Sequence, residues 1–218
     1  MFNSLKTFLN KFLLINLINL ILITLSTSEL FSKETSKIND IFLILVNKEN
    51  PLSKSYIPFD LIEITKDDNI DYIIRENEQM YINKEVLNNY KLLYNEALSH
   101  DLNLTIFSGY RSFEKQQALW DNNKDIGYLA PPGYSEHQTG FAIDVSTRNT
   151  GLTTNLTNTK EYQFLINNAY KYGFIIRYPK NKEKITGYYF EPWHLRYVGI
   201  AHSTKINNKK ITLEEYLS

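Results

Sequence analysis

A single carboxylate stands in an otherwise apolar run of this 218-residue chain, and it constrains the fold more than any other feature. The run is "FAIDV", residues 141–145, and the acid is Asp144. An ionised carboxylate in an apolar strand is costly unless it meets a partner or a metal ion. Because side chains alternate along a strand, Asp144 points away from the face formed by Phe141, Ile143 and Val145. The sequence therefore predicts a strand with one face in the core and Asp144 directed into a cleft.

A histidine lies shortly before this strand. His137 is seven positions from Asp144, an offset that a straight strand would send to the opposite face. The intervening Thr139–Gly140 step can supply a kink that brings the two side chains together, because glycine tolerates unusual backbone angles. An alternative stays open at this point, in which Asp144 caps a neighbouring loop and His137 is exposed near a turn.

The segment "YYFEPWHLRYVG" carries the second group of polar side chains. Strand alternation places His194 on a polar face, and Glu191 precedes it by three residues. Two imidazoles and a carboxylate, here His137, Asp144 and His194, form a sound three-ligand set for zinc and leave a fourth position for water. A nearby carboxylate that does not bind the metal, such as Glu191, can take a proton from that water. The alternative is an ion pair between Glu191 and Arg196.

A third polar segment reads "SGYRSFEKQQALW". A predicted strand over Leu104–Phe107 breaks at Gly109 and brings Tyr110 and Arg111 to a rim, before a helix that Ser112 caps. An arginine in that position can bind a carboxylate through two hydrogen bonds or stabilise an oxyanion. The alternative is an arginine that ties its loop to a surface acid.

Hydrophobic spacing and turn residues indicate the rest of the fold. Helices are predicted over Lys84–His100 and Lys160–Tyr172, the second closed by Gly173. Strands are predicted over Ile41–Val46 and in "FIIRYP", "TGYYF" and "WHLRYVG". Helices followed by a run of strands indicate an α+β domain with a small central antiparallel sheet flanked by helices, and the zinc site would lie in a cleft on that sheet.

The first 35 residues form a separate zone. Lys6 and Lys11 precede the apolar run "FLLINLINLILITL", after which the chain becomes polar. This layout is typical of a secretory signal, and the run is short for a membrane span. No clean cleavage site follows, so a cleaved signal and a retained membrane anchor both stay open, beside an amphipathic helix that belongs to the fold. The first two interpretations place the single domain of residues 36–218 outside the cytoplasm.

Charge and cysteine content exclude several functions. The 24 basic residues balance the 24 acidic ones, so charge gives no case for nucleic acid or an anionic membrane surface as the main partner. The chain has no cysteine, which excludes disulfides, thiolate metal sites and a cysteine nucleophile. Two further histidines, His100 and His202, lie in plainer polar surroundings and are expected on the surface.

Taken together, "SGYRSFEKQQALW", "PPGYSEHQTGFAIDVS", "YGFIIRYP" and "TGYYFEPWHLRYVG" resemble the motifs of the VanY-like zinc D-alanyl-D-alanine carboxypeptidases. This family includes L,D-carboxypeptidases that trim peptidoglycan tetrapeptides. The resemblance runs from about residue 41 to residue 217. It implies that His137, Asp144 and His194 bind one zinc ion per chain. It also implies that Glu191 is the base that activates the zinc-bound water and later protonates the leaving amine.

The resemblance implies further roles around the metal. Arg111 matches the arginine that binds the scissile carbonyl region or the terminal carboxylate of the substrate. Ser135 and Gln116 match positions that line the substrate groove, and Tyr110 is expected to contact substrate from the rim. Gln117 competes with Gln116, but the Arg-Ser-aromatic-x-x-Gln spacing favours Gln116.

The reaction implied by the resemblance is hydrolysis of the C-terminal peptide bond of a peptidoglycan stem peptide, which releases D-alanine. Pentapeptide (D,D) and tetrapeptide (L,D) substrates both stay open. The expected enzyme is an extracytoplasmic monomer with no nucleic-acid partner, which meets the membrane only through an uncleaved N-terminal segment. Within the same chemistry, the alternatives are a D,D-dipeptidase and a peptidoglycan endopeptidase. An alternative from another class is a non-catalytic zinc-bearing module that binds wall peptides.

Overall fold

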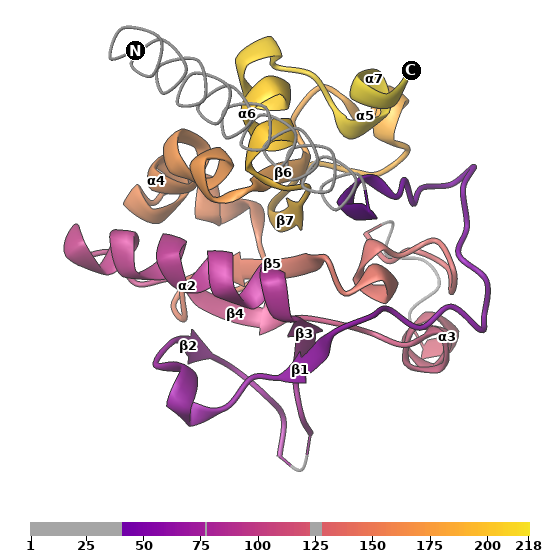
Figure 1. Ribbon diagram of the computed structural model, residues 1–218, viewed down its shortest axis with the longest axis horizontal. Coiled ribbons are helices and arrows are strands. Elements are labelled where there is room, and N and C mark those ends of the chain that lie inside the picture. Colours follow the sequence, from indigo (N-terminus) through magenta and orange to yellow (C-terminus); the bar gives the residue numbers. More distant parts are fainter. Residues whose placement is uncertain (1–40, 77, 123–127) are drawn as a thin grey trace, which may run out of the picture. The chain divides into compact units, whose positions relative to one another are not determined.

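The computed structural model describes residues 41–76, 78–122 and 128–218. Residues 42–218 form one structural unit, an α+β domain (Figure 1). The leader predicted at residues 1–35 lies outside the described residues. In chain order the elements are η1 (Ile41–Leu43), β1 (Leu61–Glu63), η2 (Lys66–Asp68), β2 (Asp71–Tyr72), β3 (Tyr81–Asn83), α2 (Lys84–Ser99), β4 (Thr105–Ser108), α3 (Phe113–Asn122), η3 (Glu136–Thr139), β5 (Ala142–Ser146), η4 (Thr154–Asn158), α4 (Lys160–Asn168), η5 (Ala169–Tyr172), β6 (Phe174–Tyr178), α5 (Glu183–Thr186), β7 (Glu191–Tyr197), α6 (Ile200–Lys209) and α7 (Leu213–Leu217).

The central sheet has the strand order β2-β4-β5-β7-β6. Strands β4, β5, β7 and β6 pair in antiparallel fashion, as predicted, whereas β2 joins β4 in parallel at one edge. The register places Asp144 of β5 opposite His194 of β7 on one side and opposite Ser108 of β4 on the other. Two segments that are 50 residues apart in sequence thus become neighbours in the middle of the sheet.

Helix α2 covers one face of this sheet (Figure 1). The side chain of Asn83 caps the helix, because it accepts hydrogen bonds from the backbone N–H groups of Glu85 and Val86. The apolar face of α2 shares one core with Ile143 and Val145 of β5. The predicted alternation along β5 is therefore confirmed, and Asp144 lies on the face opposite α2.

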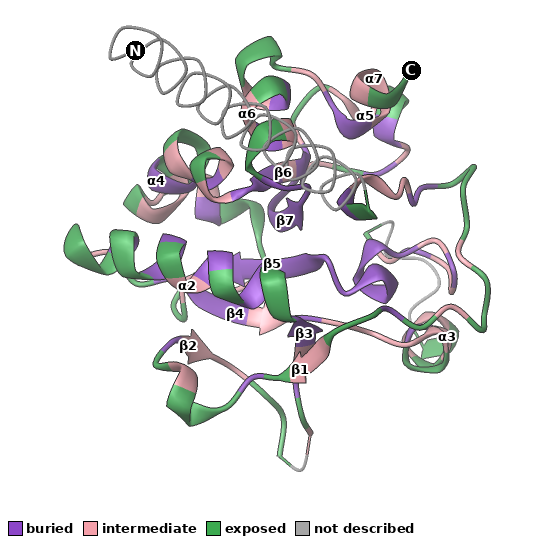
Figure 2. Ribbon diagram, in the orientation of Figure 1, coloured by how far each residue is buried: buried purple, intermediate pink, exposed green. Residues whose placement is uncertain are grey.

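The other face is covered at one end by α6 and α7. A second apolar cluster joins Ile175 of β6 and Val198 to Ile206 of α6 and Leu213 at the start of α7. Strands β5 and β7 are buried along their whole length (Figure 2). Because both faces of these strands are covered, a polar side chain on them must find a partner inside the protein.

Two of the predicted strands are wrong. Residues 41–43 form the short helix η1 and residues 44–46 form no regular element, and the carbonyls of Phe42 and Ile44 accept hydrogen bonds from Arg196. The segment "TGYYF" is also irregular, since Gly187 adopts a left-handed φ of 79° and Tyr188 packs on Tyr178. In the first segment, the side chain of Arg196 thus occupies carbonyls that a neighbouring strand would otherwise have bound.

Both long helices are confirmed. Helix α2 ends one residue earlier than predicted, and the last turn of the second helix tightens into η5 before Gly173. Among the helices that the structure describes, none combines the length and the apolar character needed to cross a bilayer.

The turn at Gly173 allows a direct test of the packing. Gly173 has a φ of 86°, and a Cβ added there would collide with the ring of Tyr197. We expect Gly173→Ala to lower the free energy of unfolding by about 2–5 kcal/mol, through backbone strain and overpacking together. Gly151, with a φ of 62° and open space around it, provides the control. Gly151→Ala should lower the free energy of unfolding by only about 1–2 kcal/mol, because it introduces backbone strain and no collision. Urea unfolding would measure both losses, and equal losses would contradict a role for the collision.

Candidate metal centre

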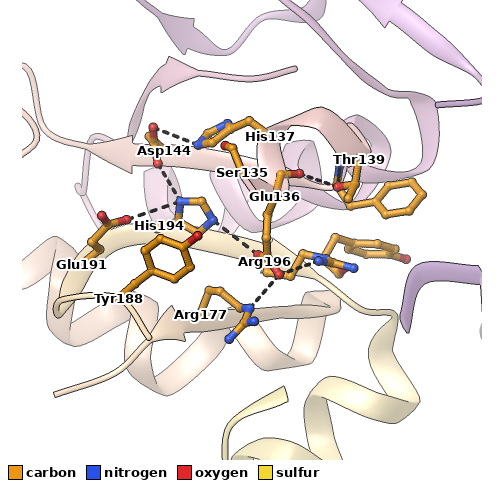
Figure 3. A network of polar contacts seen from close by, with 12 residues as sticks. Ser135, Glu136, His137, Thr139, Asp144, Arg177, Tyr188, Glu191, His194 and Arg196 are labelled. Atoms are coloured by element: carbon orange, nitrogen blue, oxygen red, sulfur yellow. Dashed lines mark hydrogen bonds and ion pairs between the residues drawn. The ribbon is translucent and has the colours of Figure 1, made fainter. Parts of the chain in front are cut away.

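Three buried side chains converge on the sheet face opposite α2 (Figure 3). They are His137 from η3, Asp144 from β5 and His194 from β7, and their candidate ligand atoms all lie within 4.8 Å of one another. The Nε2 atom of His137 is 3.2 Å from one carboxylate oxygen of Asp144. The Nδ1 atom of His194 is 3.1 Å from the other oxygen. The structure thus brings together the three residues that the sequence predicts as metal ligands.

The predicted kink before β5 is present. Gly140 ends η3 with a φ of 74°, and a Cβ added there would lie 3.0 Å from a methyl group of Leu61. The hydroxyl of Thr139 donates to the Glu136 carbonyl at 2.6 Å and accepts from the Phe141 N–H at 2.9 Å. This turn sends the His137 side chain back toward Asp144, which the sequence offset alone would not allow.

Each histidine is oriented by its second nitrogen. The Nδ1 atom of His137 lies 2.7 Å from the Gly109 carbonyl, so its Nε2 atom is left to face Asp144. The Nε2 atom of His194 faces Glu136 at 3.5 Å, so its Nδ1 atom is left to face Asp144. The two rings therefore offer different nitrogens to the same point in space.

The local charges suit a divalent cation. Burial and the charge of Arg111 lower the pKa of His137 to about 4. Burial opposes ionisation of Asp144, but His137 and His194 outweigh it and hold the pKa of its carboxyl well below the usual range. Burial also opposes protonation of His194, yet its contacts with Asp144 and Glu136 raise its pKa to about 9. Two imidazole nitrogens around one carboxylate anion are a donor set that fits zinc.

Glu191 lies beside these three residues. One of its oxygens is 3.6 Å from Nδ1 of His194, and its side chain is almost completely buried. Burial raises the pKa of Glu191 to about 8, against the opposing influence of His194. A cation held between His137, Asp144 and His194 would favour the ionised carboxylate. The alternative ion pair between Glu191 and Arg196 does not form, because Arg196 binds Glu136 instead.

Arg111 is held at the edge of the cluster by three uncharged groups. It donates to Ser108 and to Gln116 at 3.0 Å each, and to Ser135 at 3.5 Å. Its guanidinium lies 3.9 Å from Asp144, which is a buried acid and not the surface acid of the alternative interpretation. The amide of Gln116 also donates to the Ala130 carbonyl at 2.6 Å. Gln116 therefore lies behind Arg111 and fixes its direction.

A cavity of about 180 Å³ opens onto these groups. Its polar lining consists of Arg111, Ser135, Glu191 and the three candidate ligands. Much of the remaining lining is aromatic and comes from Tyr128, Tyr178, Tyr188 and Trp193. Tyr110 lines an adjoining groove, which shares Arg111 and Asp144 with the cavity. Of the predicted substrate-contacting residues, Ser135 and Arg111 thus face the cavity, while Gln116 lies behind it and Tyr110 one groove further on.

Sequence reasoning missed the buried charges behind the cavity. Glu136 binds Arg177 of β6 and Arg196 of β7 at 2.7 Å each, and all three side chains are completely buried. The available signal was an arginine in each of two strands, Arg177 as the one charged residue of "FIIRY" and Arg196 among the apolar and aromatic residues of "LRYV". Such charges need partners inside the protein. The same reasoning that singled out Asp144 would have found them.

The chain is similar in sequence to known carboxypeptidases. The family model for VanY, D-alanyl-D-alanine carboxypeptidase, matches residues 79–200. YodJ of Bacillus subtilis (strain 168), which is named as a candidate carboxypeptidase, is 39% identical over 210 residues, covering 85% of this chain and 76% of YodJ.

Solved structures give the same picture. The LdcB LD-carboxypeptidase, described as revealing the basis of peptidoglycan recognition, has a TM-score of 0.74 and 42% identity, over 81% of this chain and 85% of that one. A Zn(II) complex of a mutant of the vancomycin resistance D,D-pentapeptidase VanY has a TM-score of 0.67 and 34% identity, over 82% of this chain and 99% of that one.

The metal centre can be tested without any substrate. We expect His137→Ala to weaken zinc binding by more than about 100-fold, because even the loss of a group that only supports a ligand costs 10- to 100-fold. The control is His100→Ala, which removes the exposed histidine directly after the last residue of α2. It should leave zinc affinity unchanged in the same competition against a coloured chelator. An undiminished affinity in His137→Ala would show that zinc binds elsewhere.

Proposed function

We propose, from the premise that this chain belongs to the VanY family of D-alanyl-D-alanine carboxypeptidases, that it is a zinc peptidase that removes the terminal D-alanine from peptidoglycan stem peptides. One observation carries the proposal beyond family membership. A buried carboxylate, Glu191, and a buried guanidinium, Arg111, flank the cluster of His137, Asp144 and His194 and share one cavity with it. A module that only binds wall peptides has little need of both groups.

The proposed roles follow from these positions. Zinc held by His137, Asp144 and His194 would polarise the scissile carbonyl and lower the pKa of a water molecule toward about 7. Glu191 would take a proton from the attacking water and return it to the leaving amine. Its position supports this, because one of its oxygens lies 3.6 Å from Nδ1 of His194 and it lines the same cavity, where a bound cation would keep the carboxylate ionised and able to accept a proton.

Arg111 would bind the free carboxylate of the terminal D-alanine. A guanidinium and a carboxylate can form two parallel hydrogen bonds. Gln116 and Ser108 hold the side chain from behind, and Ser135 shares the cavity with it. A guanidinium that binds the terminal carboxylate favours release of a single residue over cleavage within a long chain.

Tetrapeptide stems are the proposed substrate. The support is comparative, because identity is 42% with the LdcB LD-carboxypeptidase and 34% with the D,D-pentapeptidase VanY. The bond cut would then join an L-residue to the terminal D-alanine.

Export of the enzyme is part of the proposal, since the stem peptides of the mature wall lie outside the cytoplasm. Residues 1–35 would direct export, as a cleaved signal or as a retained anchor, and residues 36–218 would form the carboxypeptidase domain. The basic start and the apolar run of the leader support this arrangement. We propose a monomer, because cavity and candidate ligands all come from one chain.

Muropeptides test the reaction directly. The zinc-loaded full-length chain, incubated separately with tetrapeptide and pentapeptide muropeptides, should release one D-alanine from the tetrapeptide faster, as read by mass spectrometry. Glu191→Gln should bind zinc as the wild type does and lose activity by a factor of at least about 100, because general base catalysis contributes 10²–10⁴-fold. Faster loss from the pentapeptide would reverse the proposed specificity. Cleavage of cross-linked dimers alone would identify an endopeptidase.

Blocking the free carboxylate tests the role of Arg111. A tetrapeptide that ends in D-alaninamide should be cut at least about 10-fold more slowly, because a hydrogen bond to a charged group contributes about 1.5–3 kcal/mol. For Arg111→Gln, the acid and the amide should become equally poor substrates. If the wild type cut both equally well, recognition of a free end by Arg111 would be wrong.

A further inference from the structure

The ion pairs of Glu136 with arginine use only one of its two carboxylate oxygens. Its Oε1 atom accepts from Nε of Arg177 and from Nη1 of Arg196, each at 2.7 Å. Its Oε2 atom takes part in neither bond and lies 3.5 Å from Nε2 of His194 (Figure 3). Within the described part of the chain, both of these facing atoms are buried and have no hydrogen-bond partner.

The orientation of the His194 ring explains why its Nε2 atom and Oε2 of Glu136 face each other. The Nδ1 atom of His194 faces Asp144 at 3.1 Å and is the nitrogen available to a metal. When one imidazole nitrogen binds a metal, the proton of the neutral ring must sit on the other nitrogen. For His194 that nitrogen is Nε2, and the acceptor it meets is Oε2 of Glu136. His137 has the same arrangement in reverse, with the Gly109 carbonyl behind its Nδ1 atom.

We propose that Glu136 is a positioning residue of the metal centre. Its carboxylate accepts the Nε2 proton of His194, fixes the tautomer in which Nδ1 binds zinc, and makes that nitrogen a stronger ligand through the negative charge behind the ring. This inference rests on the zinc site of the proposed function and not on its substrate. Zinc alone is therefore a sufficient probe.

The two arginines keep the carboxylate in this orientation. Arg177 is held from its far side by two hydrogen bonds to Glu214 of α7, at 2.7 and 2.9 Å. Arg196 is held by the carbonyls of Phe42 and Ile44, at 2.8 and 2.7 Å. With Oε1 fixed between two anchored guanidinium groups, Oε2 has one direction left, toward His194. Two guanidinium groups at 2.7 Å from Oε1 also favour the ionised form of the carboxylate.

A matched pair of variants separates positioning from structural support. Glu136→Gln keeps an oxygen for the arginines, but its amide group toward His194 cannot accept the Nε2 proton. Glu214→Gln removes the same charge from the same network and contacts Arg177 and not His194. Both changes should lower the unfolding midpoint of the full-length chain. Only Glu136→Gln should weaken zinc binding, by about 10- to 100-fold, the range for lost supports of metal-binding histidines.

Zinc affinity would be measured by competition with a coloured chelator, and the ligand field by the absorption spectrum of the cobalt-substituted protein. The cobalt spectrum should change in Glu136→Gln and not in Glu214→Gln. Wild-type affinity in Glu136→Gln, or an equal loss in both variants, would overturn the proposal.

A measurement on the unaltered protein covers the case in which Glu136→Gln does not fold. In the zinc-loaded wild type, nitrogen-15 spectra of the histidine rings should place the proton of His194 on Nε2 and that of His137 on Nδ1. A proton on Nδ1 of His194 would overturn the proposal without any substitution.

Discussion

The site depends on the pairing of β5 with β7, which sets Asp144 directly opposite His194. A shift of one residue in this register would send every side chain of a strand to its other face. Such a shift would also move Ile143 and Val145 out of the core beneath α2. The apolar residues between the ligands therefore fix the geometry of the metal centre, although none of them touches it.

Burial of the ligands makes a second layer of charge necessary. Glu136 lies between Arg177 and Arg196, and through them it is connected to α7 and to the segment that follows η1. Removing one partner from a buried ion pair costs about 3–5 kcal/mol, because the remaining charge has no water to solvate it. Both ends of the domain are thus coupled to the residue that faces His194. Their distance in sequence from the metal ligands does not make them independent of the site.

The parts of the fold that could be predicted are those set by local patterns. Asp144 in an apolar strand, the glycine kink before it and the spacing of α2 each have a physical reason within a few residues. The strand predicted over Ile41–Val46 failed because its carbonyls bind Arg196, 152 residues away at Ile44. The side chain of Gln116 was expected in the groove, but its hydrogen bonds to Arg111 and Ala130 place it behind that groove. Neither the contact of Arg196 nor those of Gln116 leave a periodic trace in the sequence.

The wall of the cavity is another feature that the sequence does not predict. Tyr128 and Tyr188 come from segments without regular structure, whereas the candidate ligands Asp144 and His194 lie on buried strands. An irregular segment can change its length or side chains without shifting the register of the sheet. The metal chemistry is therefore carried by the rigid part of the domain, and the shape of the space for substrate by the variable part. Because of this division, the motifs predict zinc hydrolysis well and leave the choice between tetrapeptide and pentapeptide to the loops.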